Sequence, residues 1–250
     1  MCGILKENLS KYRNIKRLLL VGMFITGLST VGSSQEFIST CEDLQNIEND
    51  LDSNYELRNN INCGGYDFEP IGEISVSQGE EDKMFQGILD GNGYEIRNLR
   101  IGYSGKNEQG FGIFPAIVDG AQIRNLGVVN AEVEGGEALT GGIVGRNGLS
   151  GAGEPTVIDK TYFEGEVTSK RQAGGVAGWN QNGRIIETYS KGTIEGKNLA
   201  GGIAGTNFDS DIEKSYSIAE IRSEEILGGI TGSNLGTNTK ISQNLFFREA

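Results

Sequence analysis

Histidine is absent from the 250-residue chain, and proline, cysteine and tryptophan are scarce, at three, three and one residues. Without histidine, a Ser-His-Asp triad, a Cys-His pair, histidine zinc ligands and the HExxH helix of metalloproteases are excluded. Scarce proline argues against a disordered glycine- and proline-rich chain, although glycine reaches 39 residues. The net charge of −12 disfavours nucleic acid and anionic membranes as partners, because like charges repel.

Long apolar runs are also rare, and the clearest one is LLLVGMFITGL at residues 18–28, directly after the basic segment KYRNIKR at residues 11–17. A basic segment, a short apolar core and small residues near Ser33 or Ser34 are typical of a secretory signal peptide. The run is shorter than the about 20 apolar residues of a transmembrane helix, although an uncleaved anchor or a buried helix remains the alternative. We therefore expect a signal peptide at residues 1–34 and a secreted or cell-surface protein that is not inserted in the membrane after cleavage.

Two cysteines remain after the expected cleavage, because Cys2 lies within the signal peptide. In an oxidising compartment we expect a disulfide between Cys41 and Cys63. Closing a loop of about 23 residues stabilises the folded state by roughly 3 kcal/mol in the chain-entropy model. Two buried free thiols are the alternative.

A repeat fills the second half of the chain. The segments TGGIVGRN, AGGVAGWN, AGGIAGTN and LGGITGSN end at Asn147, Asn180, Asn207 and Asn234, which are 33, 27 and 27 residues apart. Downstream of the first three copies, Tyr162, Tyr189 and Tyr216 recur every 27 residues. A fixed period of this length indicates a solenoid.

The residue types within each repeat predict strands. Short runs rich in Ile, Val, Thr and Tyr alternate with polar residues and are broken by Gly and Asn, and no amphipathic helical run occurs inside a repeat. We expect an all-β, parallel β-helix over residues 54–250, right-handed, with about seven rungs and a strand spacing of about 4.8 Å. A β-propeller is the structural rival, but its blades need about 40 or more residues.

Equivalent residues of successive rungs should lie over one another in such a coil. We expect an inward apolar column, a corner column of asparagines and a column of tyrosines. Their members are Ile143, Val176, Ile203 and Ile230; Asn147, Asn180, Asn207 and Asn234; and Tyr162, Tyr189 and Tyr216. Glycine permits the tight corners, and asparagine accepts left-handed backbone and bonds to neighbouring turns.

The repeated cores GGIVG, GGVAG, GGIAG and GGITG resemble the Gly-Leu-any-Gly core of the bacterial GLUG-motif repeat proteins. The upstream segments FISTCEDLQNIENDLDSNYELRNNINCGGYDFEPIG and FQGILDGNGYEIRNLRI resemble the lead-in that commonly precedes such repeats, so the resemblance runs from Phe37 to the end. It implies an exported β-helix of the kind found in surface adhesins and in accessory regions of immunoglobulin A1-cleaving metalloproteases. It implies no conserved active site.

Residues 35–53 are expected to form an N-terminal cap with a short helix. Ser39 followed by Glu42 fits a capping box. The apolar face of this helix would consist of Leu44, Ile47 and Leu51. A helix over the first rung would shield a sheet edge that invites aggregation. No equivalent cap follows NLFFREA, so we expect that the last rung protects itself, that it pairs with a missing segment, or that two subunits associate end to end through the C-terminal rung.

Catalytic and metal-binding patterns are weak, and we expect no cofactor, no metal ion and no enzymatic activity. Acidic residues are scattered, as at Glu132, Glu164 and Asp209, so no pair is placed at catalytic separation. The segment LDGNGYEI at residues 89–96 is faintly like a calcium loop but lacks further ligands, and it is better interpreted as a tight turn.

Trp179, the only tryptophan, is the best candidate for a binding surface. Alternation from an inward Val176 places Ala177 outward, Gly178 inward and Trp179 outward, with Arg146 in the same column of the preceding rung. This surface could bind a glycan or a protein ligand on a cell surface, and adhesion is the leading hypothesis. The alternatives are an incidental surface aromatic, a polysaccharide-active lyase or hydrolase, and a structural spacer module.

Overall fold

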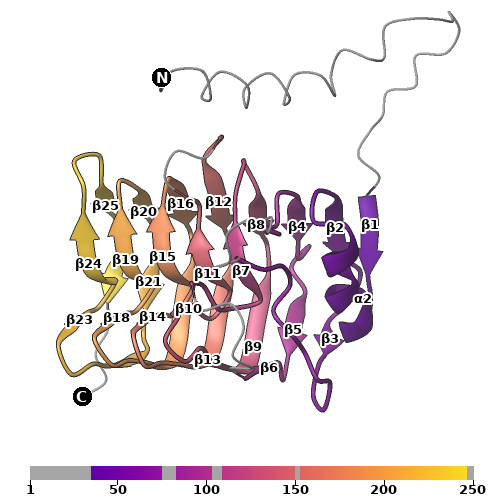
Figure 1. Ribbon diagram of the computed structural model, residues 1–250, viewed down its shortest axis with the longest axis horizontal. Coiled ribbons are helices and arrows are strands. Elements are labelled where there is room, and N and C mark those ends of the chain that lie inside the picture. The colour runs from indigo at the N-terminus through magenta and orange to yellow at the C-terminus, as the bar shows by residue number, and fades with distance from the viewer. Residues whose placement is uncertain (1–34, 75–82, 103–108, 150–152, 247–250) are drawn as a thin grey trace, which may run out of the picture. The chain divides into compact units, whose positions relative to one another are not determined.

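The computed structural model describes residues 35–74, 83–102, 109–149 and 153–246. In these ranges nearly all regular structure is parallel strand, arranged in four sheets (Figure 1). The expected all-β parallel β-helix is therefore confirmed, while the hand of the coil stays a prediction. The expected signal peptide at residues 1–34 lies outside the described residues.

A complete turn of the chain visits four sheets, which we call sheets I to IV in the order of the turn, and the first turns contribute strands to sheets I and II alone. Sheet I contains β1 (Gln35–Ile38), β2 (Asn54–Leu57), β4 (Ile88–Asp90), β8 (Gln122–Arg124), β12 (Thr156–Asp159), β16 (Gly183–Ile186), β20 (Asp211–Glu213) and β25 (Lys240–Ser242). Sheet II contains β3 (Ile61–Asn62), β5 (Glu95–Arg97), β6 (Arg100–Ile101), β9 (Gly127–Glu134), β13 (Tyr162–Ser169), β17 (Tyr189–Gly196), β21 (Tyr216–Ser217), β22 (Glu220–Arg222) and β26 (Leu245–Phe246).

Sheets III and IV carry the two strands of each GG-containing motif. Sheet III contains β10 (Leu139–Gly141), β14 (Gln172–Gly174), β18 (Leu199–Gly201) and β23 (Ile226–Gly228). Sheet IV contains β7 (Phe114–Ile117), β11 (Val144–Asn147), β15 (Ala177–Gln181), β19 (Ala204–Phe208) and β24 (Thr231–Leu235). Figure 1 shows the strands of sheet IV side by side, one from each successive turn.

The glycine pairs allow sheets III and IV to pack almost backbone to backbone. A β-carbon at Gly174 in sheet III would overlap the carbonyl oxygen of Ala177 and the backbone nitrogen of Gly205, both in sheet IV. A β-carbon at the next glycine, Gly175, would meet the side chain of Ser190 in sheet II. Small residues in the motif therefore serve close approach of the sheets.

The core consists of side chains stacked from rung to rung. In sheet I, five residues in register are fully buried: Leu89, Ile123, Ile158, Ile185 and Ile212. The predicted apolar column at the corner between sheets III and IV is buried at Ile143, Val176 and Ile203, and Ile230 is partly buried against it.

The asparagine column forms a ladder of side-chain hydrogen bonds. Asn147 donates through Nδ2 to Oδ1 of Asn180 at 2.7 Å, and Asn180 donates in the same way to Asn207 at 2.7 Å. Asn207 continues the ladder to Asn234 at 3.0 Å. Asn147, Asn180 and Asn207 are fully buried, so the ladder bonds satisfy amide groups that have no access to water, although Oδ1 of Asn147 at the start of the ladder has no hydrogen-bond partner among the described residues.

The N-terminal end is closed by α2 (Cys41–Gln45) and the 3-10 helix η1 (Asn46–Asn49). The disulfide between Cys41 and Cys63 is present, with an S–S distance of 2.04 Å. Leu44 and Ile47 are fully buried and Leu51 partly so, as their spacing predicted.

The predicted capping box was wrong by one residue. The N-cap is Thr40, whose Oγ1 accepts from the backbone nitrogen of Asp43 at 3.1 Å. Asp43 Oδ2 in turn accepts from the backbone nitrogens of Ser39 and Thr40, each at 3.0 Å. With the helix starting after Thr40, Cys41 points inward, where it forms the disulfide with Cys63, and Glu42 is exposed.

Candidate binding surface

Arg146 and Trp179 lie in register in β11 and β15, as the sequence predicted. Both side chains are half-buried. Arg146 donates through Nε to the carbonyl oxygen of Gln109 at 2.9 Å, and burial, together with the charge of Arg171, lowers the pKa of its guanidinium. The Trp179 ring is tilted towards Phe208 with a centroid separation of 6.3 Å.

Trp179 therefore offers less free aromatic surface than an outward strand position would. Its Nε1 is buried and has no hydrogen-bond partner among the described residues. Ala177, which the alternation placed outward, is fully buried. The alternation fails because Val176 belongs to the corner between sheets III and IV, where the backbone changes direction between β14 and β15.

The tyrosine column forms a continuous stack along sheet II. The rings of Tyr162 and Tyr189 are 4.8 Å apart and those of Tyr189 and Tyr216 are 5.0 Å apart, with interplanar angles of 3° and 10°. Each neighbouring pair covers one ring face of each partner. Tyr162 and Tyr216, at the two ends of the stack, therefore each have one ring face that no other tyrosine of the stack covers.

A glycine ends the stack on the N-terminal side. In the register of sheet II, Tyr162 pairs with Gly127, and Gly127 pairs with Glu95. The Tyr162 ring leans over this glycine, since a β-carbon at Gly127 would overlap its Cζ and hydroxyl. The hydroxyl reaches across and donates to Glu95 Oε1 at 2.7 Å.

The neighbouring corner between sheets I and II is built from residues with left-handed backbone. Asn92, Asn125 and Lys160 have φ values of 52°, 51° and 47°. The DGNG segment forms this corner in its rung, where the Tyr94 nitrogen donates to the Gly91 carbonyl at 2.8 Å, as expected for a tight turn.

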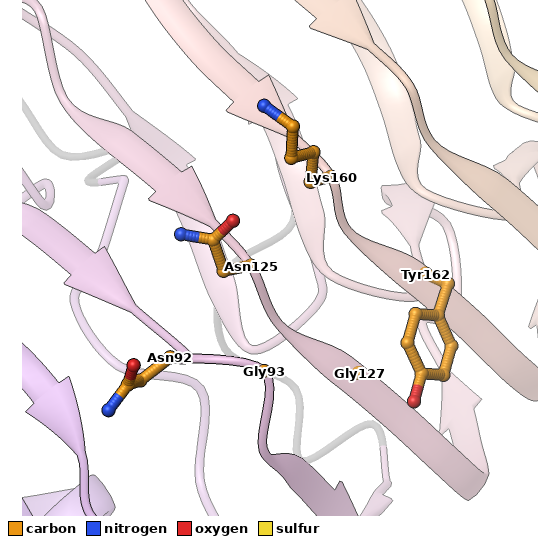
Figure 2. A pocket seen from close by; sticks show the side chains of 6 residues that line it. All are labelled: Asn92, Gly93, Asn125, Gly127, Lys160 and Tyr162. Atoms are coloured by element: carbon orange, nitrogen blue, oxygen red, sulfur yellow. The ribbon is translucent and has the colours of Figure 1, made fainter.

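Together these features enclose an open hollow of about 330 Å³, which we call the Tyr162 hollow. It is lined by Asn92, Gly93, Asn125, Gly127, Lys160 and Tyr162 (Figure 2).

Asp90 fixes two asparagines beside the Tyr162 hollow. Its Oδ1 accepts from Asn125 Nδ2 at 3.0 Å and from the Asn92 backbone nitrogen at 2.9 Å, and its Oδ2 accepts from Arg124 Nε at 2.9 Å. Burial alone would raise the pKa of Asp90, but these hydrogen bonds outweigh burial and lower it. Because the Asn125 amino group is engaged, its amide oxygen is turned towards the side of Lys160, as Figure 2 shows.

The charged groups of the hollow stay in one protonation state near neutral pH. The hydrogen bond from Tyr162, followed by that from Arg97, lowers the pKa of Glu95. Burial, followed by the bond to Glu95, raises the pKa of Tyr162 to about 12. The bond to Asp159 at 3.1 Å raises the pKa of Lys160. The hollow thus offers an aromatic ring, amide oxygens and an ammonium group for recognition, and none of these three titrating groups is poised for proton transfer at neutral pH.

Sequence reasoning named Tyr162 only as a repeat column and missed the hollow. Two signals pointed to it. The segment IRNLGVV has Gly127 at the position of the repeated tyrosine, and the DGNG corner carries more residues between its strands than the corners of later rungs. The sequence alone does not show that Gly127 and the DGNG corner lie next to each other, because this follows from the register of the strands in sheet II.

The described residues contain neither a cluster of metal ligands nor a helix that could span a membrane. Within them, His, Cys, Asp and Glu side chains nowhere gather in threes or more as metal ligands. In the same ranges no helix combines the length and the apolar character that a bilayer crossing requires.

Comparisons with known proteins give two distant relatives. The chain is 31% identical over 166 residues to halomucin of Haloquadratum walsbyi, covering 61% of this chain and 2% of that protein. It is also 31% identical over 120 residues to a putative Gly-rich membrane protein of Evansella cellulosilytica, covering 44% of this chain and 13% of that protein. No family model matches the chain, and no solved structure does. The similarity thus concerns a small part of two much longer proteins.

Proposed function

We propose that this chain is a GLUG-motif repeat protein, exported and associated with the cell surface, that mediates adhesion by binding a glycan without modifying it. The Tyr162 hollow carries this proposal, because it combines one aromatic wall with fixed polar groups on a rigid sheet corner. The GG-containing repeats and the signal-like N-terminus support export to the surface.

The groups of the hollow match the chemistry of a neutral sugar. A pyranose ring has apolar C–H faces that pack on an aromatic side chain and hydroxyls that both donate and accept. The amide oxygen of Asn125 accepts from a hydroxyl, and the Lys160 ammonium donates to one. Asp90, Glu95 and Asp159 surround these groups, so the site disfavours polyanionic sugars.

The names of the relatives agree with a location at the cell surface. One is a halomucin and the other a Gly-rich membrane protein. This chain spans only 2% and 13% of their lengths. We therefore use the two names as support for a location at the cell surface and infer no activity from them.

A glycan array followed by calorimetry with neutral oligosaccharides tests the glycan proposal. Lys160→Ala should weaken binding about tenfold, the equivalent of about 1.4 kcal/mol. Lys191→Ala is the matched control, since Lys191 lies in sheet II, does not line the hollow and has a similarly exposed side chain, 54% against 57%. Absence of binding to any neutral glycan, or equal effects of the two variants, would overturn the proposal.

The enzyme alternative has a separate readout. Incubation with neutral and acidic polysaccharides, analysed for shortened products, should leave the chains intact. Degradation that disappears in an acidic-residue variant such as Glu95→Gln would replace the binding function with a polysaccharide-cleaving one.

A further inference from the structure

Exposed large apolar side chains of the described residues gather at one end of the coil. Eight such side chains are exposed, and six of them belong to β23, β24, β25, β26 or the residues between these strands. These six are Ile226, Leu227, Leu235, Ile241, Leu245 and Phe246. We call residues 226–246 the C-terminal rung. Leu227 is 59% exposed, whereas Ala200 at the same position of the preceding rung is fully buried, and Leu245 is 60% exposed.

The backbone of the C-terminal rung is unpaired on one side within the part of the chain that the structure describes. β23, β24, β25 and β26 are each the terminal strand of their sheet. A strand edge of this kind pairs readily with another strand, and proteins usually protect it with charges or proline. The rung thus presents four strand edges at once.

Protective charges are almost lacking in the C-terminal rung. Residues 226–246 contain one charged residue, Lys240, in a chain with 22% charged residues. Lys240 is already engaged, because its Nζ lies 2.9 Å from Glu213 Oε1. The surface is therefore apolar and nearly neutral, which suits a partner with the same character.

At the opposite end of the described coil, α2 and η1 cover the interior, and β1 is the terminal strand of sheet I. There Leu44 and Ile47 of α2 and η1 are completely buried, and the Arg58 guanidinium lies 3.6 Å from the ring centroid of Phe37, which remains 52% exposed. Figure 1 places α2 and the C-terminal rung at opposite ends of the described coil. A head-to-tail filament is disfavoured, because the capped end offers no matching set of strand edges.

We propose that two copies of this chain associate tail to tail through their C-terminal rungs. Each copy supplies the same apolar patch and the same four edges, which is the self-complementarity that an isologous dimer requires. Strands that meet across the two-fold axis run antiparallel and can exchange backbone hydrogen bonds. Leu227, Leu245 and their neighbours lose contact with water in this arrangement.

Sedimentation and light scattering of the full chain over about 1 µM to about 500 µM test the proposal. Wild type should form a closed dimer that does not grow further. Leu227→Glu and Leu245→Glu, both at exposed positions, should weaken dimerisation at least about tenfold by placing like charges in the interface. Phe37→Glu is the matched control at the capped end and should dimerise as wild type does.

Two outcomes would overturn the proposal. One is a wild-type chain that stays monomeric over the whole range, as it would if another segment covers the rung. The other is a dimer that the Phe37 variant weakens as much as the two leucine variants. Hydrogen exchange of wild type gives an independent readout that needs no variant: amides of β23 to β26 should become more protected as concentration rises.

Discussion

Glycine sets how closely sheets III and IV approach, and the effect is confined to single positions. Gly174 has no room for a β-carbon because backbone atoms of Ala177 and Gly205 occupy the space. Backbone cannot move aside as a flexible side chain can. By contrast, at Gly102 no heavy atom of the described residues, apart from its neighbours in the chain, lies within 4 Å of the place where a β-carbon would be.

Gly174→Ala is therefore expected to destabilise the fold by about 3 kcal/mol or more, or to prevent folding. Gly102→Ala should change the free energy of unfolding by less than about 1 kcal/mol. Urea unfolding followed by circular dichroism compares the two. Equal, small effects would contradict the close packing of the sheets.

The asparagine ladder gives a second prediction for a single residue. Asn180→Ala removes two ladder bonds and leaves the Asn147 amino group and the Asn207 carbonyl oxygen buried without these partners. We expect a loss of about 2 to 6 kcal/mol, since each stranded buried group costs about 1 to 3 kcal/mol.

Asn234→Ala is the control for the ladder, because Asn234 is exposed and accepts only the last bond. Asn234→Ala should lower the free energy of unfolding by less than about 1 kcal/mol, measured by urea unfolding as for the glycine variants. If both variants lose the same stability, burial of the ladder does not matter.

Which residues stack could be predicted from the sequence, since a period of 27 fixes the register wherever the copies are complete. The tyrosine and asparagine columns followed directly from it. Side-chain direction could not be predicted at corners, and Ala177 shows why: alternation applies only within one strand. The hollow at Gly127 was missed because it depends on an absent side chain next to an enlarged corner.

At the scale of elements, α2 shows a limit of local sequence rules. Ser39 with Glu42 and Thr40 with Asp43 both satisfy the spacing of a capping box. What decides between them is tertiary: only the second frame buries Cys41 and Leu44 together against the first rung. The disulfide partner of Cys41 then follows, and it was predicted because Cys63 is the only other cysteine of the expected mature chain.

The capping box makes part of the stability pH-dependent. The backbone N–H of Ser39, together with Thr40 and against the effect of burial, lowers the pKa of Asp43 in the folded state. A lowered folded pKa means that this stability is present above the unfolded pKa of about 3.9 and is lost as pH falls through the folded pKa.

Asp43→Asn should therefore destabilise the protein at about pH 6, and its difference from wild type should shrink as pH falls towards about 2. Thermal unfolding across this range measures the difference. Glu42→Gln removes a charge from the same turn without removing a capping bond, so it controls for net charge. A constant difference for Asp43→Asn would contradict the role of its carboxylate.

At the scale of the whole described coil, stability is distributed over layers that contact mainly their neighbours, with few exceptions such as the bond from Tyr162 to Glu95 two layers away. Residues 172–198 are one full turn, because Gln172 pairs with Leu199 in sheet III and Tyr189 with Tyr216 in sheet II. Removing one turn should leave an intact coil one layer shorter, with Leu199 placed over Leu139.

We expect deletion of residues 172–198 to give a soluble, cooperatively unfolding protein with modestly reduced stability. Deletion of residues 172–184, about half a turn, should fail to fold because every later strand is displaced from its sheet. Circular dichroism and denaturant unfolding distinguish the two deletions. A folded half-turn deletion would show that the layers are not in fixed register.

The amide ladder also has a direction. Every rung from Asn147 to Asn207 donates towards the C-terminal rung, so turning one amide over would set donor against donor on one side and acceptor against acceptor on the other. All the amides are thus locked in one common orientation. In two coils that meet at their C-terminal rungs the ladders run in opposite directions, so neither ladder can continue into the other coil. The amide column then terminates at the junction, so the contact provides no template on which a third coil could add.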